Sequence, residues 1–169
     1  MPISKLLMTL SACVLFSTQP AQAELPANCS VTTLTNPERS ALDCGTIILE
    51  LGEGTVLQYF GDNNGVPQSL TIKSGSALVD VEPGSQSPRI RTPHAIAAVR
   101  GTIYAIEVSD GATSVFVLRG TVDVNNRRGT SKTATLSAGQ GVEVIPRQPF
   151  FVEEWDDTRV RDLLARFGR

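Results

Sequence analysis

The chain of 169 residues is poor in the side chains that most enzymes use for chemistry. It has one histidine, His94, so the sequence excludes a metal site built from several imidazoles. A Ser-His-Asp triad would have to use His94, and no nucleophile motif accompanies it. No G-x-G-x-x-G fingerprint leads from a strand into a helix, and there is no P-loop lysine. These absences argue against an enzyme, and we expect no catalytic residue, cofactor or metal.

Dense basic patches and long apolar runs are also absent. The chain carries 15 basic and 17 acidic side chains without a basic cluster, so we do not expect nucleic acid as a partner. After residue 23 only Lys73 and Lys132 are lysines, and the other basic residues are arginines. Arginine suits fixed hydrogen bonds to carboxylates, carbonyls or anionic ligands, although biased genomic composition would also favour it. Beyond the N-terminal segment no stretch approaches the ~20 apolar residues of a membrane-spanning helix.

Residues 1–23 have the pattern of an export signal. Lys5 supplies the positive start, an apolar core runs from Leu6 to Phe16, and Ala21-Gln-Ala23 forms a small-residue cleavage site. Cleavage there would leave a chain of one-domain size without a transmembrane segment. The alternative is a lipobox, Leu10-Ser-Ala-Cys13, which would anchor the protein through a lipid on Cys13. We expect ordinary secretion.

Removal of the signal leaves two cysteines, Cys29 and Cys44, in the N-terminal segment 24–52. Two cysteines in an oxidising compartment are expected to pair. A closed loop of this size stabilises a fold by about 3 kcal/mol in chain-entropy models. A metal site or a redox pair is the rival interpretation, but neighbouring histidines are missing and the spacing is not C-x-x-C.

Short β-rich runs fill most of the chain, each a few residues long and bounded by turn residues. They are Thr46–Leu51, Thr55–Phe60, Ser69–Lys73, Ala77–Glu82, Ile96–Val99, Ile103–Ser109, Ala112–Leu118, Ala134–Leu136 and Val142–Ile145. The Asp110-Gly111 pair predicts a hairpin, and the doubly apolar run Val115–Leu118 predicts a central strand covered on both faces. A Gly-Thr pair followed by a β-branched residue recurs, which suits a coiled sheet that turns corners. We therefore predict an all-β roll or solenoid-like domain over 53–146, with a jelly-roll-like β-sandwich as the alternative.

The pattern changes after Pro149, and 150–169 reads as one amphipathic helix. Trp155, Leu163, Leu164 and Phe167 fall near one face, while acids crowd the first turn and arginines the last. We expect this helix to cap an open end of the β core. The alternative is a helix that docks a partner, with Trp155 as the candidate contact.

An ordered set of motifs spans residues 68–144. It comprises Thr92-Pro93, Arg100-Gly101-Thr102, Arg119-Gly120-Thr121-Val122 and Gly139-Gln140. In this order and spacing the motifs resemble the FecR domain, a bacterial envelope module with no known catalytic chemistry. The resemblance implies an all-β roll and a location in the periplasm of a Gram-negative bacterium.

We interpret the motif residues as a structural signature, not as an active site. Arg100 follows an apolar run, where an unpaired charge is costly, so we expect it to lock turn carbonyls or to pair with Glu107 or Asp80. An anionic ligand is the alternative partner for Arg100. Gly101 would allow a bend and Thr102 could bond backbone groups beside it. His94 is expected at a surface turn.

FecR proteins typically relay signals between an outer-membrane receptor and an inner-membrane anti-sigma regulator. This chain departs from that design, since we find neither an anti-sigma segment nor a transmembrane helix. We therefore expect a stand-alone periplasmic binding or sensing module. Its partner would be an envelope protein or a cell-wall glycan, and a self-assembling structural envelope protein is the alternative.

Overall fold

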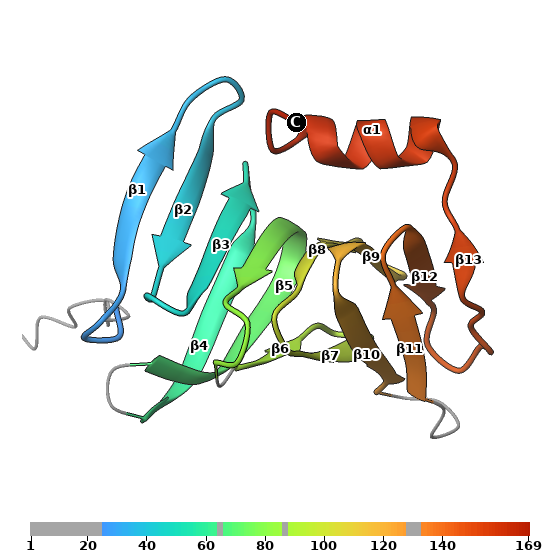
Figure 1. Ribbon diagram of the computed structural model, residues 1–169, viewed down its shortest axis with the longest axis horizontal. Helices are drawn as coiled ribbons and strands as arrows, with labels where there is room; N and C mark the ends of the chain where they lie inside the picture. The colour runs from blue at the N-terminus through green and yellow to red at the C-terminus, as the bar shows by residue number, and fades with distance from the viewer. Residues whose placement is uncertain (1–24, 64–65, 86–87, 128–132) are drawn as a thin grey trace, which may run out of the picture.

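The computed structural model describes residues 25–63, 66–85, 88–127 and 133–169, so the signal segment 1–23 and Cys13 lie outside the described residues. The described part contains one helix, α1 (Asp157–Ala165), and thirteen strands (Figure 1). The strands are β1 (Ser30–Leu34), β2 (Arg39–Asp43), β3 (Ile47–Gly52), β4 (Val56–Asn63), β5 (Val66–Val81), β6 (Arg89–Arg91), β7 (Ala95–Val99), β8 (Ile103–Val108), β9 (Thr113–Arg119), β10 (Thr121–Asn126), β11 (Thr133–Ser137), β12 (Gln140–Val144) and β13 (Glu153–Glu154).

The strands form one curled sheet with two layers. The upper layer in Figure 1 has the order β1-β2-β3-β5-β8-β9-β12-β13, and the lower layer has the order β4-β5-β6-β7-β10-β11. Strand β5 belongs to both layers: residues 66–74 pair with β4 and β6, and residues 75–81 pair with β3 and β8. The sequence predicts a break at Ser74-Gly75, but the chain only bends there, with Gly75 at φ +95°.

The hydrophobic core lies between the two layers. Alternate side chains of each strand point into it, as the period of two in a strand dictates. The upper layer contributes Leu49, Val79 and Tyr104, and the lower layer contributes Leu70 and Ile90, all fully buried. The prediction of an all-β protein is confirmed. The finer class, a β-roll or solenoid rather than a jelly-roll sandwich, stays a prediction.

The predicted hairpin and the predicted central strand are both confirmed. Asp110-Gly111 joins β8 to β9, and Ser109 N donates to Ala112 O at 3.0 Å. Strand β9 lies between β8 and β12. Its Val115 and Val117 enter the main core, while Phe116 points to the opposite side and packs against α1. The strand is therefore covered on both faces.

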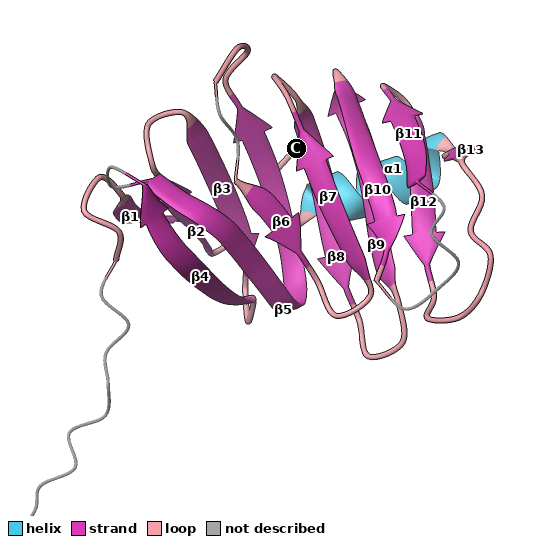
Figure 2. Ribbon diagram, turned by 90° about the horizontal axis from the view of Figure 1, so that it is seen from below, coloured by secondary structure: helices cyan, strands magenta, loops and turns pink. Residues whose placement is uncertain are grey.

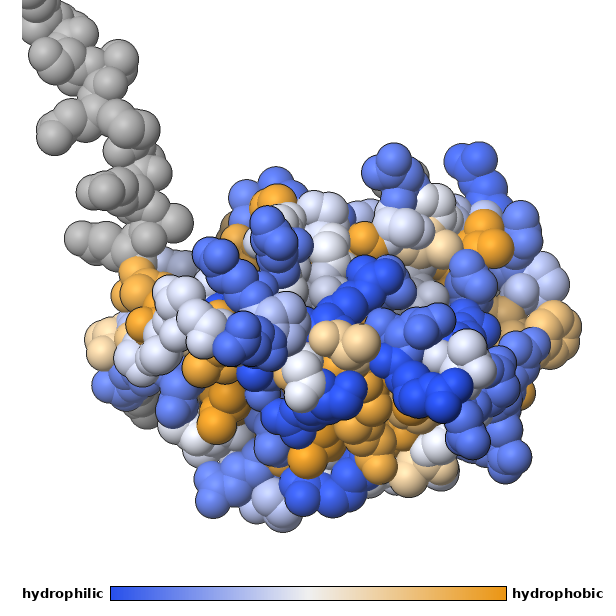
Figure 3. All heavy atoms as spheres, turned by 90° about the horizontal axis from the view of Figure 1, so that it is seen from above, coloured by the Kyte–Doolittle hydropathy of each residue, from blue (hydrophilic) through white to orange (hydrophobic). Residues whose placement is uncertain are grey.

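Helix α1 is shorter than the predicted span 150–169 and covers a different part of the sheet. Glu153–Glu154 form β13, which pairs with Gln140 and Gly141, and Asp156 starts the helix as its N-cap. The helix lies on the outer face of the upper layer, not at an open end of the core (Figure 1). Seen from this side, the surface has hydrophilic and hydrophobic residues interspersed (Figure 3). Leu78, Ala105 and Phe116 form an apolar patch on that face of the upper layer. Leu163 of α1 and Phe167 after it cover this patch and remove it from water. At nine residues α1 is too short to cross a bilayer, and the described residues contain no helix that could.

The predicted disulfide is present. Cys29 directly precedes β1 and Cys44 directly follows β2, so the Cys29–Cys44 bond closes the base of the β1–β2 hairpin. Sequence patterning missed both of these strands, because their residues are mostly polar and half or fully exposed. The bond therefore cross-links the two open ends of a weakly covered hairpin, and the pairing of β2 with β3 attaches this hairpin to the rest of the upper layer.

Candidate functional site

The two Arg-Gly-Thr motifs form the corners where the chain passes between layers. Arg100-Gly101-Thr102 links β7 below to β8 above, and Arg119-Gly120-Thr121 links β9 above to β10 below. Thr102 is fully buried at this meeting point. Its Oγ1 lies 2.9 Å from Thr121 O and 3.1 Å from Arg100 O, and it accepts a hydrogen bond from Thr121 N at 3.3 Å. One threonine hydroxyl therefore joins the two corners.

The glycines of these corners are required by conformation and by space. Gly101 has φ +60° and Gly120 has φ +86°, which L-residues rarely adopt. A Cβ on Gly120 would lie 2.9 Å from both Gly101 O and Thr102 Oγ1. A Cβ on Gly101 would lie 2.9 Å from the Cα of Pro83. Backbone conformation and close packing therefore both require glycine at these two positions.

The role that the sequence suggests for Arg100 is wrong. Its side chain is exposed and makes no ion pair or hydrogen bond with the described residues. Of its two expected acidic partners, Asp80 instead faces Arg119 at 3.7 Å and Glu107 faces Arg166 at 2.8 Å. The apolar run before Arg100 ends at the corner, so the arginine emerges into solvent. The Thr102 hydroxyl, not the Arg100 side chain, makes the hydrogen bonds that join the backbone of the two corners.

A second buried polar cluster surrounds the Thr92-Pro93 motif between β6 and β7. Thr92 Oγ1 accepts from Ala95 N at 2.8 Å and lies 2.9 Å from Thr113 Oγ1 on β9, while His94 Nδ1 lies 3.1 Å from the same Thr113 oxygen. Arg127 donates to Thr92 O at 2.9 Å. The cluster ties the lower layer to the upper one. His94 is 7 % exposed, so its expected place at a surface turn is wrong.

The remaining motif residues shape turns or fill the core. Gly139 has φ +84° and donates from its N to Val117 O at 2.9 Å, and Gln140 Oε1 accepts from Ser137 N at 2.9 Å. Val122 is fully buried opposite Val99 and Leu136.

Trp155 lies half-buried where β13 leads into α1. Its ring stacks on Phe116, with centroids 5.2 Å apart, and the Arg159 guanidinium carbon lies 3.7 Å from the ring centroid. A side chain at Gly141 would collide with the same ring. Trp155 thus fastens the start of the helix to β9, and its part in a partner contact stays a prediction.

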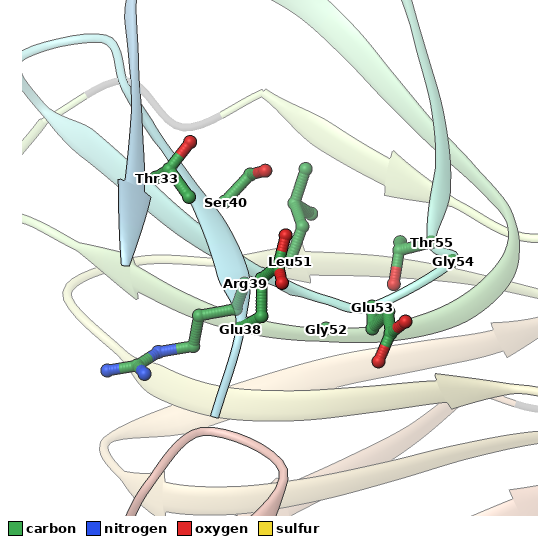
Figure 4. A pocket seen from close by; sticks show the side chains of 9 residues that line it. All are labelled: Thr33, Glu38, Arg39, Ser40, Leu51, Gly52, Glu53, Gly54 and Thr55. Atoms are coloured by element: carbon green, nitrogen blue, oxygen red, sulfur yellow. The ribbon is translucent and has the colours of Figure 1, made fainter. Parts of the chain in front are cut away.

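A small pocket of about 220 Å³ opens beside the turn between β3 and β4 (Figure 4). Its lining is Thr33, Glu38, Arg39, Ser40, Leu51, Gly52, Glu53, Gly54 and Thr55. Arg39 is already held by Glu50 Oε2 at 2.8 Å, and in Figure 4 its guanidinium points away from Glu53. Thr55 Oγ1 donates to Ser76 O at 2.9 Å. The Arg39 cation and the Thr55 hydroxyl of this pocket are therefore already engaged in contacts within the protein. Within the described ranges, three or more His, Cys, Asp or Glu side chains nowhere gather as a metal site.

The curled sheet is open at both ends, and the end formed by β1 and β4 has two unpaired strand edges. Among the described residues β1 pairs with β2 alone and β4 pairs with β5 alone. Apolar side chains are exposed along both edges: Val31 is 52 % exposed, Val56 46 % and Phe60 58 %. Unpaired edges with exposed apolar residues are a template for another strand. They are the most conspicuous binding feature of this side of the molecule.

The described residues thus form a curled all-β sheet with buried turn motifs and unpaired strand edges. The chain belongs to the FecR family: the family model described as FecR protein matches residues 31–123, more than half of the chain. The match begins at β1, well before the stretch 68–144 on which the sequence resemblance rests. This family is regulatory, not catalytic.

Solved structures share the fold. Two crystal structures of a candidate anti-sigma factor from Parabacteroides distasonis ATCC 8503, at 2.50 and 1.65 Å resolution, superimpose with TM-scores of 0.62 and 0.57. Each is 17 % identical and covers 80 % of this chain. The chain in turn spans 64 % and 60 % of those proteins, less than two thirds of their length. No curated protein matches the sequence.

Proposed function

We propose that this FecR-family protein is an exported, non-catalytic binding and sensing module of the bacterial cell envelope, and that it engages another envelope protein. The family match over residues 31–123 carries the proposal. The Cys29–Cys44 disulfide fits an oxidising compartment such as the periplasm of a Gram-negative bacterium. The N-terminal signal pattern supports export, and lipidation of Cys13 would be an alternative way to hold the protein in the envelope.

The proposed contact surface is the end of the curled sheet that carries the edge strands β1 and β4. A partner strand can add to such an edge through backbone hydrogen bonds, with affinity increased by apolar contacts to alternate side chains. Proteins usually protect edges with lysine, proline or a bulge. The β1 residues Ser30–Leu34 include no charge and no proline, so this edge is open to pairing.

Photo-crosslinking in cells tests this surface. A photo-reactive residue replaces Phe60 on β4, and the matched control carries it at Asp162, an exposed position of α1. Tyr104, in contrast, lies in the core and is unsuitable. We expect the Phe60 probe to capture one identifiable envelope protein and the Asp162 probe to capture none.

The alternative function, self-assembly into a structural envelope protein, predicts a different adduct. Edge-to-edge pairing of two copies would give crosslinks between identical chains, together with a large species on size exclusion. Adducts that form equally from both positions, or from neither, would contradict the proposed contact at β4.

A further inference from the structure

The described arginines differ in whether an acidic side chain accompanies them. Five arginines above or beside the upper layer have acidic partners: Arg39 and Arg169 contact Glu50, Arg119 contacts Asp80, Arg159 contacts Glu143 and Arg166 contacts Glu107. Arg161 on α1 instead donates to the Thr158 hydroxyl. Arg89, Arg91 and Arg100 belong to the lower layer, and none of them has an ion pair or a hydrogen-bond acceptor for its side chain among the described residues. Three cations without counter-charges therefore lie on one side of the molecule.

The strand register places these arginines on the outer face of the lower layer. Leu70, Ile90, Ala97, Val122 and Leu136 point into the core, so their neighbours in each strand point outward. We call this surface the lower face: Ser69, Thr71, Arg89, Arg91, Ile96, Ala98, Asp123, Asn125, Thr133 and Thr135, with Arg100 and Thr121 at its border. Figure 2 shows this layer from outside, with α1 behind it, so the helix does not cover the lower face.

The lower face presents polar groups in rows across the strands. One row runs Thr71, Arg91, Ile96, Asn125, Thr133, and the next runs Ala98, Asp123, Thr135. Thr133 Oγ1 donates to Asn125 Oδ1 at 2.6 Å, and Thr135 Oγ1 donates to Asp123 Oδ1 at 2.7 Å. These bonds hold an amide and a carboxylate in fixed orientations, each with a second oxygen lone pair or N–H still available to a ligand.

Two further observations concern sites for a ligand on this face. In the described part of the chain three buried side-chain polar atoms have no hydrogen-bond partner, and two of them, Ser69 Oγ and Arg91 Nε, belong to the lower face. Native proteins rarely leave such atoms unsatisfied. A shallow hollow of about 420 Å³ is lined by Ala98, Val99, Arg100, Thr121 and Asp123, and so brings a cation and a carboxylate to one depression.

We propose that the lower face binds a polysaccharide that carries carboxylate sugars. The planar forks of Arg91 and Arg100 match carboxylates, and the hydroxyls and amide of the face match sugar hydroxyls. Asp123 favours a glycan over an acidic peptide, because its carboxylate accepts hydrogen bonds from sugar hydroxyls, which acidic side chains lack. Its charge repels both kinds of polyanion, so only the glycan has contacts that offset this repulsion. This site lies on a different surface from the edges β1 and β4, so it stands independently of the protein contact proposed above.

Calorimetric titration with a galacturonic acid oligomer tests the proposal on the purified protein. Methyl-esterified oligomer and polyglutamate are the comparison ligands. We expect the free acid to bind, the ester to bind far more weakly, and polyglutamate to bind more weakly than the free acid. Arg91→Gln and Arg100→Gln should each weaken binding of the acid about tenfold, as expected for loss of a hydrogen bond to a charged group. The control Arg161→Gln, on the exposed side of α1, should bind as the wild type does.

Asp123→Asn separates the two classes of polymer. Loss of the negative charge relieves repulsion of both polymers, so polyglutamate should bind more tightly, whereas galacturonate also loses a charged acceptor for its hydroxyls and should gain less. The proposal is overturned if galacturonate does not bind, if it binds equally to the Arg91 and Arg161 variants, or if polyglutamate binds more tightly, which would assign the face to an acidic protein segment. Thermal unfolding of each variant verifies that the fold is retained. The crosslink at Phe60 should persist in the arginine variants, so either proposal can fail alone.

Discussion

The hydroxyl oxygen of Thr102 lies 2.9 Å from the backbone carbonyl oxygen of Thr121, although Thr102 directly precedes β8 of the upper layer and Thr121 begins β10 of the lower layer. The contact sits where both Arg-Gly-Thr motifs turn the chain from one layer to the other. A repeated tripeptide thereby becomes a single joint. The side chain that makes the joint is buried, whereas the charged residue of each motif is exposed.

Thr102→Val should therefore destabilise the protein by about 2 kcal/mol, because the valine keeps the shape but leaves the backbone groups of Thr121 without their buried partner. Chemical denaturation of the purified protein measures the change. Thr135→Val is the matched control, since it removes the hydrogen bond to Asp123 from an exposed position and should change stability by less than about 0.5 kcal/mol. Equal effects at the two positions would contradict the assigned role of Thr102.

Gly120→Ala and Gly139→Ala separate backbone strain from crowding. Both glycines have similar positive φ values, +86° and +84°, so each alanine should cost about 1–2 kcal/mol for its conformation. A Cβ at Gly139 meets no atom within 4 Å, but at Gly120 it meets Gly101 O and Thr102 Oγ1 at 2.9 Å. The Gly120 variant should thus unfold at distinctly lower denaturant than the Gly139 variant. The reverse order would show that the corner is loosely packed.

Tyr104→Phe should stabilise the protein by about 1 kcal/mol at neutral pH, since the buried hydroxyl finds no hydrogen-bond partner among the described residues. Burial also raises the pKa of Tyr104 far above its usual value. The unfolded chain releases this proton near pH 10, whereas the folded protein retains it at that pH. The free energy of unfolding should therefore be constant with respect to this group below about pH 10 and should fall as the pH rises above it. Denaturation at pH 7 and at pH values above about 10 should show this alkaline loss in the wild type and a smaller one in the variant. A destabilised Tyr104→Phe protein would mean that the hydroxyl is bonded.

Reduction of the Cys29–Cys44 bond should lower the free energy of unfolding by about 3 kcal/mol, given a sequence separation of 15 residues. Unfolding with and without a thiol reductant measures this loss. The double variant Cys29→Ser, Cys44→Ser provides the control, since a reductant should leave its unfolding unchanged. A wild-type protein insensitive to reductant would show that the hairpin is held by its strand pairing alone.

Patterns that act locally were sufficient to predict much of the fold. The Asp110-Gly111 turn, the doubly apolar Val115–Leu118 run and the cysteine pair each depend on neighbouring residues or on one pairing. The start of α1 was missed, because Glu153 and Glu154 suit the first turn of a helix as well as they suit an exposed strand. The helix begins only where the Asp156 side chain accepts hydrogen bonds from Thr158 N and Arg159 N.

The candidate sites were harder to predict, because burial depends on what comes from elsewhere in the chain. His94 has the sequence surroundings of a surface turn, yet Thr113 on β9 covers it. Arg100 follows apolar residues that suggested burial, yet the corner carries it into solvent. The lower face could not be seen in the sequence, since its arginines and threonines are dispersed over four strands and the turn after β7. Only the register brings them into rows.

Strand β5 makes the two layers inseparable. It pairs with β3 and β8 above and with β4 and β6 below, so neither layer can open without breaking hydrogen bonds to the same sixteen residues. Edge strands such as β1 and β11 can unpair locally, but unpairing of β5 would unfold both layers together. Amide hydrogens along β5 should exchange only through global unfolding, and both layers should share one unfolding transition.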